Sequence, residues 1–213
     1  MGFFGGWIVG DGYYVKMRSS GKWILHGEGP LWDSAWVMRH IYAVRAPSPS
    51  MWIWSVSEAL GEQQVFEAIK FHYTGKGDGR IYARTRTPIA RVNLPIREYY
   101  LDAQGRRLPF VRPLDVSIVD APRWDSIAFE HILELLREKP LYREMISRIY
   151  QEIDGVWHMH SEVSSETYVL GRTPHLRVGL RQLDVYLHSF RPMVGGNACK
   201  KVILYIPDQI ICQ

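Results

Sequence analysis

Alternating polar and apolar positions repeat clearly after residue 65 and predict a series of short strands. In residues 80–86 one parity carries Arg, Tyr, Arg and Arg, and the other carries Ile, Ala and Thr. A period of two with one polar face is typical of a half-buried antiparallel strand. With residues 66–73 this segment predicts a hairpin around a glycine-rich turn, and residues 98–102 and 107–110 predict a second hairpin.

Apolar residues at spacings of three and four predict helices in the second half of the chain. Asp125 or Ser126 can cap a first helix, because side-chain oxygens there accept free backbone N–H groups, and Pro140 ends it. The same spacing predicts a helix over residues 142–153 and another over 176–190. Further strands are expected over residues 88–92, 156–163, 167–170, 201–206 and 209–212. Hairpins with helices inserted between them favour an α+β fold over a parallel α/β sheet.

The first sixty residues carry a weaker pattern. Short strands are predicted at residues 7–9, 13–15 and 23–25, and a short helix at 55–61. The stretch 46–50 contains two prolines and is expected to interrupt regular structure. Residues 195–196, a glycine pair, are expected to form a linker.

Composition describes an ordinary folded chain. Of 213 residues, 46% are hydrophobic and 23% charged, which excludes a disordered chain, a coiled coil and a collagen-like repeat. The formal charge is +4, from 26 basic and 22 acidic residues, so a dedicated nucleic-acid binder is not expected. Two cysteines, Cys199 and Cys212, exclude a cysteine-rich scaffold; they can pair if their strands are adjacent, or they can simply be buried.

Nothing in the sequence reads as a membrane span or a signal peptide. The apolar stretches are far shorter than the ~20 residues that a spanning helix needs. The glycine-rich start lacks the basic segment that opens a signal peptide. Taken alone, the chain is expected to be soluble, and an anchor ahead of it stays an open possibility.

One group of polar residues has the pattern of metal ligands. On a strand, His158, His160 and Glu162 would share one face, and two imidazoles with a carboxylate can bind a metal ion. The same alternation arises when Trp157, Met159 and Val163 point inward from an exposed polar face, which is the commoner cause. No phosphate-binding glycine loop, dinucleotide fingerprint or nucleophile elbow occurs, so no cofactor is predicted.

Tryptophan is concentrated near the start of the chain, where six of the eight residues precede position 55. Exposed, they could stack on sugar rings in a polysaccharide-binding module or hydrolase; buried, they would fill a core. The residues in question are Trp23, Trp32, Trp36, Trp52 and Trp54.

Several segments, in order, resemble the FtsQ/DivIB family of bacterial cell-division proteins. The hairpin over residues 78–91, with Arg86-Thr87-Pro88-Ile89-Ala90, is similar to that family's "R-x-P-I/V-A" segment, and residues 99–105 are similar to its "Y-Y-hydrophobic-D-x-x-G". Trp157 followed by residues 169–171, the helix over 180–190 and the closing strands over 202–212 also resemble family motifs. The resemblance covers residues 65–213.

The resemblance implies a fold and a function. Residues 1–87 are expected to form a small POTRA-like domain and residues 88–213 a larger β domain of antiparallel strands with packed helices. The expected role is a non-enzymatic divisome scaffold that recruits FtsB- and FtsL-type partners. Such a protein acts on the periplasmic side of the inner membrane, at the division septum, held by an N-terminal anchor.

Two sets of site residues follow from the resemblance. The C-terminal strands are expected to provide a docking edge, since an edge strand exposes unpaired N–H and C=O groups; the alternative is that these residues only complete the core. Its expected residues are Val202, Leu204, Tyr205, Ile206 and Gln209. At the junction of the domains, a recruitment segment is expected to meet an acidic partner, although a solvated strand face explains the same charges. Its residues are Arg84, Arg86, Pro88 and Arg91.

Overall fold

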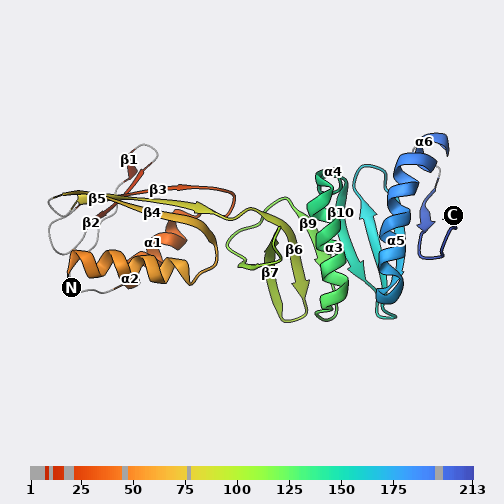
Figure 1. The fold of residues 1–213 in the computed structure, drawn as a ribbon, viewed down its shortest axis with the longest axis horizontal. Helices are drawn as coiled ribbons and strands as arrows, with labels where there is room; N and C mark the ends of the chain where they lie inside the picture. The colour runs from red at the N-terminus through yellow and green to blue at the C-terminus, as the bar shows by residue number, and fades with distance from the viewer. Residues whose placement is uncertain (1–7, 10–11, 17–21, 45–47, 76–77, 195–198) are drawn as a thin grey trace. The chain divides into compact units, whose positions relative to one another are not determined.

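The structure is a computed structural model, and it describes residues 8–9, 12–16, 22–44, 48–75, 78–194 and 199–213. The chain divides into two compact units (Figure 1). The first comprises Met1–Thr87 with Leu108–Leu114, and the second comprises Pro88–Arg107 with Asp115–Gln213. Each unit combines helices with a mixed sheet, which confirms the predicted α+β class.

The first unit contains a five-stranded sheet in the order β1-β2-β3-β5-β4. β3 runs parallel to β5, and β4 runs antiparallel to it. Two helices, α1 and α2, connect β3 to β4. The assignment as a POTRA-like domain stays a prediction. The elements are β1 (Ile8–Val9), β2 (Gly12–Lys16), β3 (Lys22–Glu28), α1 (Ser34–Ala43), α2 (Pro49–Gly61), β4 (Phe66–Gly75) and β5 (Asp78–Thr85).

The helices of the first unit begin at side-chain caps. Asp33 accepts a hydrogen bond from the Trp36 backbone N–H at 2.9 Å, and α1 follows. Ser48 accepts one from the Met51 N–H at 3.3 Å, and Pro49 lies in the first turn of α2, where its missing N–H costs nothing. The predicted helix at 55–61 is therefore only the second half of α2, and the sequence pattern missed α1.

The core of the first unit is built around tryptophan. Trp23 and Leu25 on β3 are fully buried and meet Trp52 from α2, with the Trp23 and Trp52 ring centroids 5.4 Å apart. Gly79 on β5 makes room for this pair, since a Cβ there would lie 2.4 Å from the Trp23 ring. A large aromatic ring and an adjacent glycine thus form one packing unit.

The second unit contains a nine-stranded sheet in the order β14-β13-β12-β11-β10-β9-β6-β7-β8. Its strands are β6 (Pro88–Leu94), β7 (Arg97–Asp102), β8 (Arg107–Pro109), β9 (Ser117–Asp120), β10 (Ile146–Gln151), β11 (Val156–Ser161), β12 (Thr167–Arg172), β13 (Lys201–Ile203) and β14 (Ile211–Cys212). Its helices are α3 (Ser126–Glu138), α4 (Pro140–Met145), α5 (Thr173–Val185), the π-helical η1 (Tyr186–Phe190) and α6 (Arg191–Val194). Three strand pairs are parallel: β6 with β9, β9 with β10, and β12 with β13.

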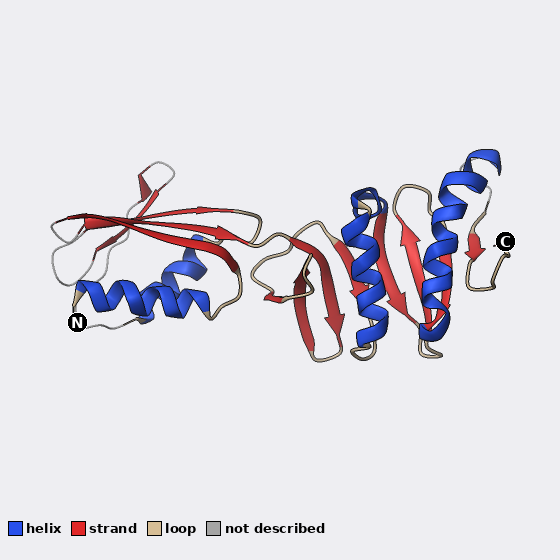
Figure 2. Cartoon of the chain, viewed as in Figure 1, coloured by secondary structure: helices blue, strands red, loops and turns tan. Residues whose placement is uncertain are grey.

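Helices α3 and α5 pack on one face of this sheet (Figure 2). As predicted, Asp125 caps α3, accepting a hydrogen bond from the Ala128 N–H at 3.1 Å. The apolar faces of α3 and α5 pack against the inward residues of the strands, among them Trp157 and Met159, in one continuous core. No helix in the described ranges is both long and apolar enough to cross a membrane.

The predicted helix over residues 142–153 is wrong. The structure instead has α4 up to Met145 and then β10. The register of β10 against β11 shifts between Ile146 and Arg148, so Ile146 and Ile149 both face the core although they are three residues apart. A β-bulge therefore produced the helix-like spacing.

The two terminal strands are shorter than predicted, and Cys199 and Cys212 form a disulfide, with Cα atoms 5.3 Å apart. The predicted linker at 195–196 lies outside the described residues.

The Leu108–Leu114 segment is held to the rest of the first unit by Arg112, which donates from Nε and Nη2 to the Pro30 carbonyl at 2.9 and 2.6 Å.

Candidate protein-docking site

β14 is the last strand of the nine-stranded sheet, and no further strand in the described part of the chain pairs with it. It pairs antiparallel with β13 through Val202↔Cys212 and Ile203↔Ile211. Gln213 and Lys201 exchange both backbone hydrogen bonds, at 2.9 and 3.0 Å. Because the direction of N–H and C=O groups alternates along a strand, those of Cys212 and Ile210 point away from β13.

The side chains predicted for partner binding divide into two groups. Val202 and Leu204 are fully buried in the core, and the Leu204 N–H donates to the Val169 carbonyl at 2.9 Å. Tyr205 and Ile206 are half-buried, and Gln209 is exposed in the turn before β14. Tyr205 packs on β12, since a Cβ at Gly171 would lie 2.4 Å from the Tyr205 Cβ.

The face of the sheet opposite the helices carries two rows of side chains that cross the strands. Strand register places the first row at Arg91, Ile118, Arg148, His160, Thr167 and Lys201. The second row consists of Asn93, Asp120, Tyr150, His158, Val169, Ile203 and Ile211. The first row is mostly basic, and the second becomes aromatic and apolar towards β14.

Ion pairs neutralise part of the basic row. Arg148 Nε lies 2.5 Å from Asp120 Oδ2, and Arg91 pairs with Glu98. Lys201, next to the edge strand, is exposed. Near β14, the half-buried Ile203 and Ile211 therefore lie close to an accessible positive charge.

His158 lies in the second row and is 5% exposed. Its ring stacks on Tyr150 at 5.1 Å, and its Nε2 lies 3.4 Å from Glu152 Oε1. Burial lowers the pKa of His158, because the charged ring loses hydration, and the Glu152 carboxylate opposes this shift. His158 is therefore a neutral, packed ring near pH 7.

The metal-ligand pattern does not come together as a cluster. His158 and His160 share one face, as predicted, but Glu162 follows the end of β11 and is exposed. The expectation that Val163 points inward is wrong, because it also lies beyond β11 and is 68% exposed. His160 Nδ1 lies 3.5 Å from Thr167 Oγ1. Within the ranges that the structure describes, no group of three or more His, Cys, Asp or Glu side chains could hold a metal ion.

The junction residues belong to different units. Arg84 on β5 pairs with Glu67 at 3.0 Å and Glu28 at 4.0 Å, and Arg86 Nε donates to the Gln64 carbonyl at 3.0 Å. Pro88 is buried at the start of β6. The arginine charges of the first unit are thus already partly engaged within that unit.

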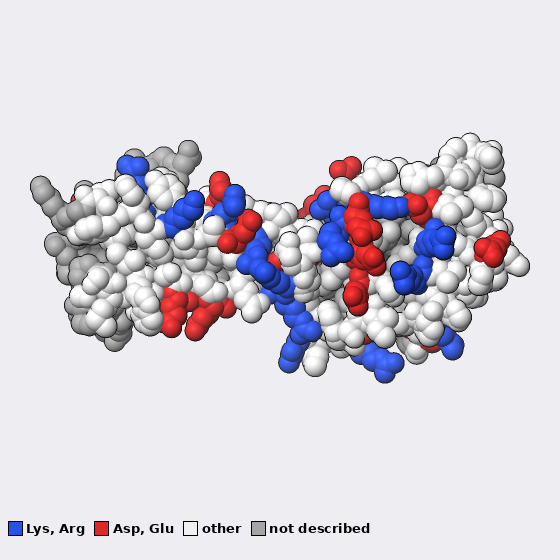
Figure 3. Space-filling model, viewed as in Figure 1, with Lys and Arg blue, Asp and Glu red and all other residues white. Residues whose placement is uncertain are grey.

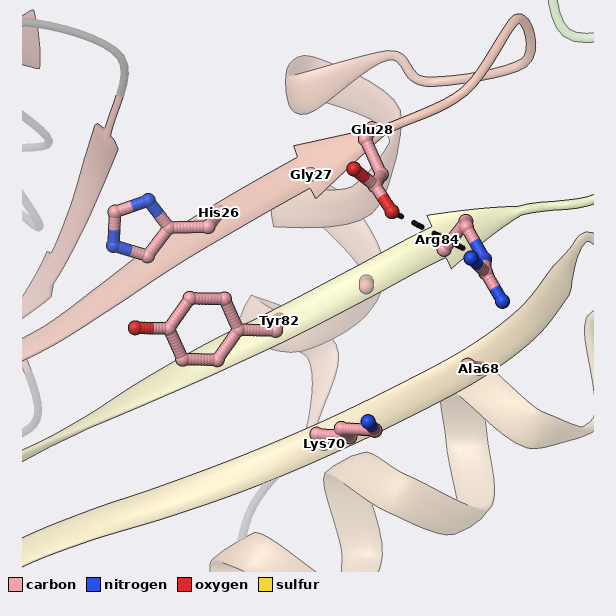
Figure 4. A pocket seen from close by; sticks show the side chains of 8 residues that line it. His26, Gly27, Glu28, Ala68, Lys70, Tyr82 and Arg84 are labelled. Atoms are coloured by element: carbon pink, nitrogen blue, oxygen red, sulfur yellow. Dashed lines mark ion pairs between the residues drawn. The ribbon is translucent and has the colours of Figure 1, made fainter.

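A shallow hollow of about 380 Å³ lies on the helix-free face of the first sheet (Figure 4). The His26 and Tyr82 rings stand side by side on β3 and β5, 4.9 Å apart and nearly parallel. Lys70 on β4 is next to Tyr82 in register, and the Glu28–Arg84 ion pair closes one end. The two rings stack on each other, so their faces do not form a platform for a sugar.

The tryptophans proposed as sugar-stacking platforms mostly pack inside the first unit. Trp23 and Trp52 are buried, and Trp32 covers Gly27, where a Cβ would lie 2.1 Å from its ring. Trp36 stacks on His40 at 4.1 Å. Trp54 is 65% exposed.

Sequence reasoning missed a buried polar cluster in the second unit. Glu166 is fully buried and accepts hydrogen bonds from Tyr168 and Tyr186, each at 2.8 Å, while Arg191 Nε lies 3.3 Å away. Burial raises the pKa of Tyr168 to about 12 and that of Tyr186 as well. Glu166 directly precedes β12 and carries no signal in a single sequence, because two of its partners come from η1 and α6.

On the face drawn in Figure 3, basic and acidic side chains are interspersed over α3 and α5. This mixed charge does not form the single-sign patch that nucleic-acid binding requires. The second unit is thus a nine-stranded sheet with β14 at one edge and helices on one face.

Residues 87–213 match the family described as "FtsQ/DivIB, C-terminal related". This match covers more than half of the chain, which therefore belongs to the FtsQ/DivIB-related family. Membership indicates a role in cell division, in a family that is non-enzymatic. None of the curated proteins matches the chain.

Proposed function

We propose that this protein is a divisome scaffold that recruits FtsB- and FtsL-type partners at the division septum through the edge strand β14. The observation that carries the proposal is the position of β14 as the last strand of the nine-stranded sheet. A partner segment added to β14 would form main-chain hydrogen bonds with the groups of Ile210 that point away from β13.

Side-chain contacts would give this docking its specificity. Ile203 and Ile211 lie beside the edge on the helix-free face, with the exposed Lys201 in the neighbouring row. Tyr205 and Gln209 flank the strand in the preceding turn. A partner with apolar residues on one side of its strand and an acidic residue nearby fits this surface.

The disulfide supports an extracytoplasmic location. Disulfides persist in oxidising compartments and are rare in the cytosol. The Cys199–Cys212 bond therefore fits action on the periplasmic side of the inner membrane, with a membrane anchor ahead of the described region.

Arg84 and Arg86 are the proposed recruitment residues of the first unit, with Pro88 and Arg91 across the boundary of the second. An acidic partner there would compete with Glu67 for the Arg84 guanidinium. Such contacts contribute to association rate and register more than to affinity.

The test compares two substitutions at Ile210. Ile210→Pro removes an N–H that points away from β13, whereas Ile210→Ala removes the side chain and keeps that N–H. For binding of a purified FtsB-type partner, Ile210→Pro should raise Kd at least about tenfold more than Ile210→Ala, as expected for losing a backbone hydrogen bond and strand register. Equal effects would refute docking by strand addition. Proline at position 204 is unsuitable, since it would break the Leu204–Val169 bond inside the sheet.

A further inference from the structure

The disulfide encloses the whole docking edge. Cys199 precedes β13, Cys212 lies within β14, and the segment between them contains β13 and the turn. Cys199 is 2% exposed, whereas Cys212 is exposed at the edge of the sheet. Cys199 is therefore shielded by the protein, and Cys212 is the exposed residue of the pair.

The backbone pairing between β14 and β13 is short. β14 has two paired residues, Ile211 and Cys212, followed by the bonds of Gln213 to Lys200 and Lys201. Such a short strand is marginal by itself. β13, in contrast, also pairs with β12 and places Val202 in the core. Loss of the cross-link should therefore release β14 and leave β13 in place.

We propose that Cys199–Cys212 is a site of thiol–disulfide exchange with a dithiol oxidoreductase, attacked at Cys212, and that its reduction releases β14 from the sheet. The consequence for partner docking rests on the proposed function; the exchange itself does not.

The exchange occurs in two displacements. A thiolate of the oxidoreductase attacks Cys212 Sγ, the Cys199–Cys212 bond breaks, and Cys199 leaves as a thiolate that takes up a proton from water. The second cysteine of the oxidoreductase, as a thiolate, then attacks the sulfur of the first cysteine, which is bonded to Cys212. Cys212 leaves as a thiolate and takes up a proton from water. The protein gains two electrons and two protons, and the oxidoreductase becomes a disulfide.

Access favours attack at Cys212. An attacking thiolate must reach the disulfide from solvent, and Cys212 is the exposed residue of the pair while Cys199 is buried.

A trapping experiment tests the site. The oxidised full chain is incubated with a thioredoxin-type protein whose second active-site cysteine is replaced by serine, so that the mixed disulfide persists. Non-reducing digestion and mass spectrometry should find the adduct on Cys212, with Cys199 free for alkylation. An adduct on Cys199, or none, would overturn the proposal. The double variant Cys199→Ser/Cys212→Ser is the blank and should give no adduct.

Hydrogen exchange tests the release of β14. After reduction, the amides of Lys200, Lys201 and Gln213 should exchange at least tenfold faster, because their bonds link β14 to β13. The Leu204 amide, bonded to the Val169 carbonyl, is the internal control and should not change. Unchanged exchange at all four amides would refute release.

Partner binding separates this inference from the proposed function. If the oxidised protein binds the FtsB-type partner and the reduced protein binds at least tenfold more weakly, both proposals are supported. If both forms bind equally, redox control of docking is refuted and the scaffold function stands. If the oxidised protein does not bind, the scaffold function is refuted, and the trapping result still decides the exchange site.

Discussion

The two sheets of this protein each carry helices on one face, but their cores are stabilised differently. The first unit packs Trp23 against Trp52 and relies on Gly79 to make room for the rings. The second unit buries many aliphatic residues and, among them, the charged Glu166. The core of the first unit therefore depends on the shape of a few large side chains. The core of the second unit depends on a broad apolar area and on one buried polar cluster that must keep all its hydrogen bonds.

The largest expected effect is at that polar cluster. Glu166→Ala leaves Arg191 and the hydroxyls of Tyr168 and Tyr186 without their shared acceptor. Removing one partner of a buried ion pair costs about 3–5 kcal/mol, so the second unit should lose that much stability in urea unfolding.

Glu130→Ala is the matched control, because Glu130 is an exposed glutamate on α3. It should change the free energy of unfolding by less than about 0.5 kcal/mol. If Glu166→Ala were equally mild, the buried cluster would not be a main support of the second unit. The comparison between the two cores would then have to be drawn on apolar packing alone.

A smaller effect is expected from glycine in the first unit. Gly79→Ala forces a Cβ against the Trp23 ring and should cost about 1–3 kcal/mol, as overpacking of a core does. Gly61→Ala is the control, because nothing lies within 4 Å of its Cβ and alanine favours a helix by about 0.5–1 kcal/mol. Thermal unfolding of both variants measures the difference. If Gly79→Ala were as stable as the wild type, the tryptophan core would accommodate an added methyl group.

The smallest effect is a pH dependence confined to the second unit. Because burial lowers the pKa of His158, the unfolded chain binds a proton more readily than the folded one. The contribution of His158 to stability is therefore complete above about pH 6.5, and it is lost as the pH falls through the folded-state pKa. Urea unfolding between pH 8 and pH 5 should show this loss in the wild type and less of it in His158→Gln.

His72→Gln supplies the comparison in the first unit, since His72 is exposed on β4. It should leave the pH dependence of the wild type unchanged. An identical pH profile for His158→Gln and the wild type would show that the buried ring contributes nothing to acid sensitivity.

The strands and helices of the second unit were largely predictable because their patterns are local. The Asp125 cap, the inward Trp157 and Met159, and the α+β class all follow from short-range alternation and capping. β10 was misread as a helix because its bulge depends on β11, which the local pattern does not contain.

The first sixty residues of the first unit were harder to predict for a physical reason. Tryptophan is large enough to fill a core from one position, so the regular alternation that marks a strand is weak there. α1 also escaped prediction, because Val37 and Ile41 are its only buried apolar residues.

The candidate site was predictable in location but not in detail. The closing segments did indicate the region of the sheet edge, yet Val202 and Leu204 point into the core and β14 forms the edge itself. Only long-range pairing decides which of two short strands is outermost, and that information is spread over the whole sheet.

The Leu108–Leu114 segment has a consequence for how such genes can recombine. The first unit is not continuous in the sequence, since this segment, held by Arg112 on the Pro30 carbonyl, is encoded within the second unit. A single crossover near codon 87 would transfer the first unit without residues 108–114. Exchange of domains between relatives would therefore preserve the first unit only when both stretches come from the same parent.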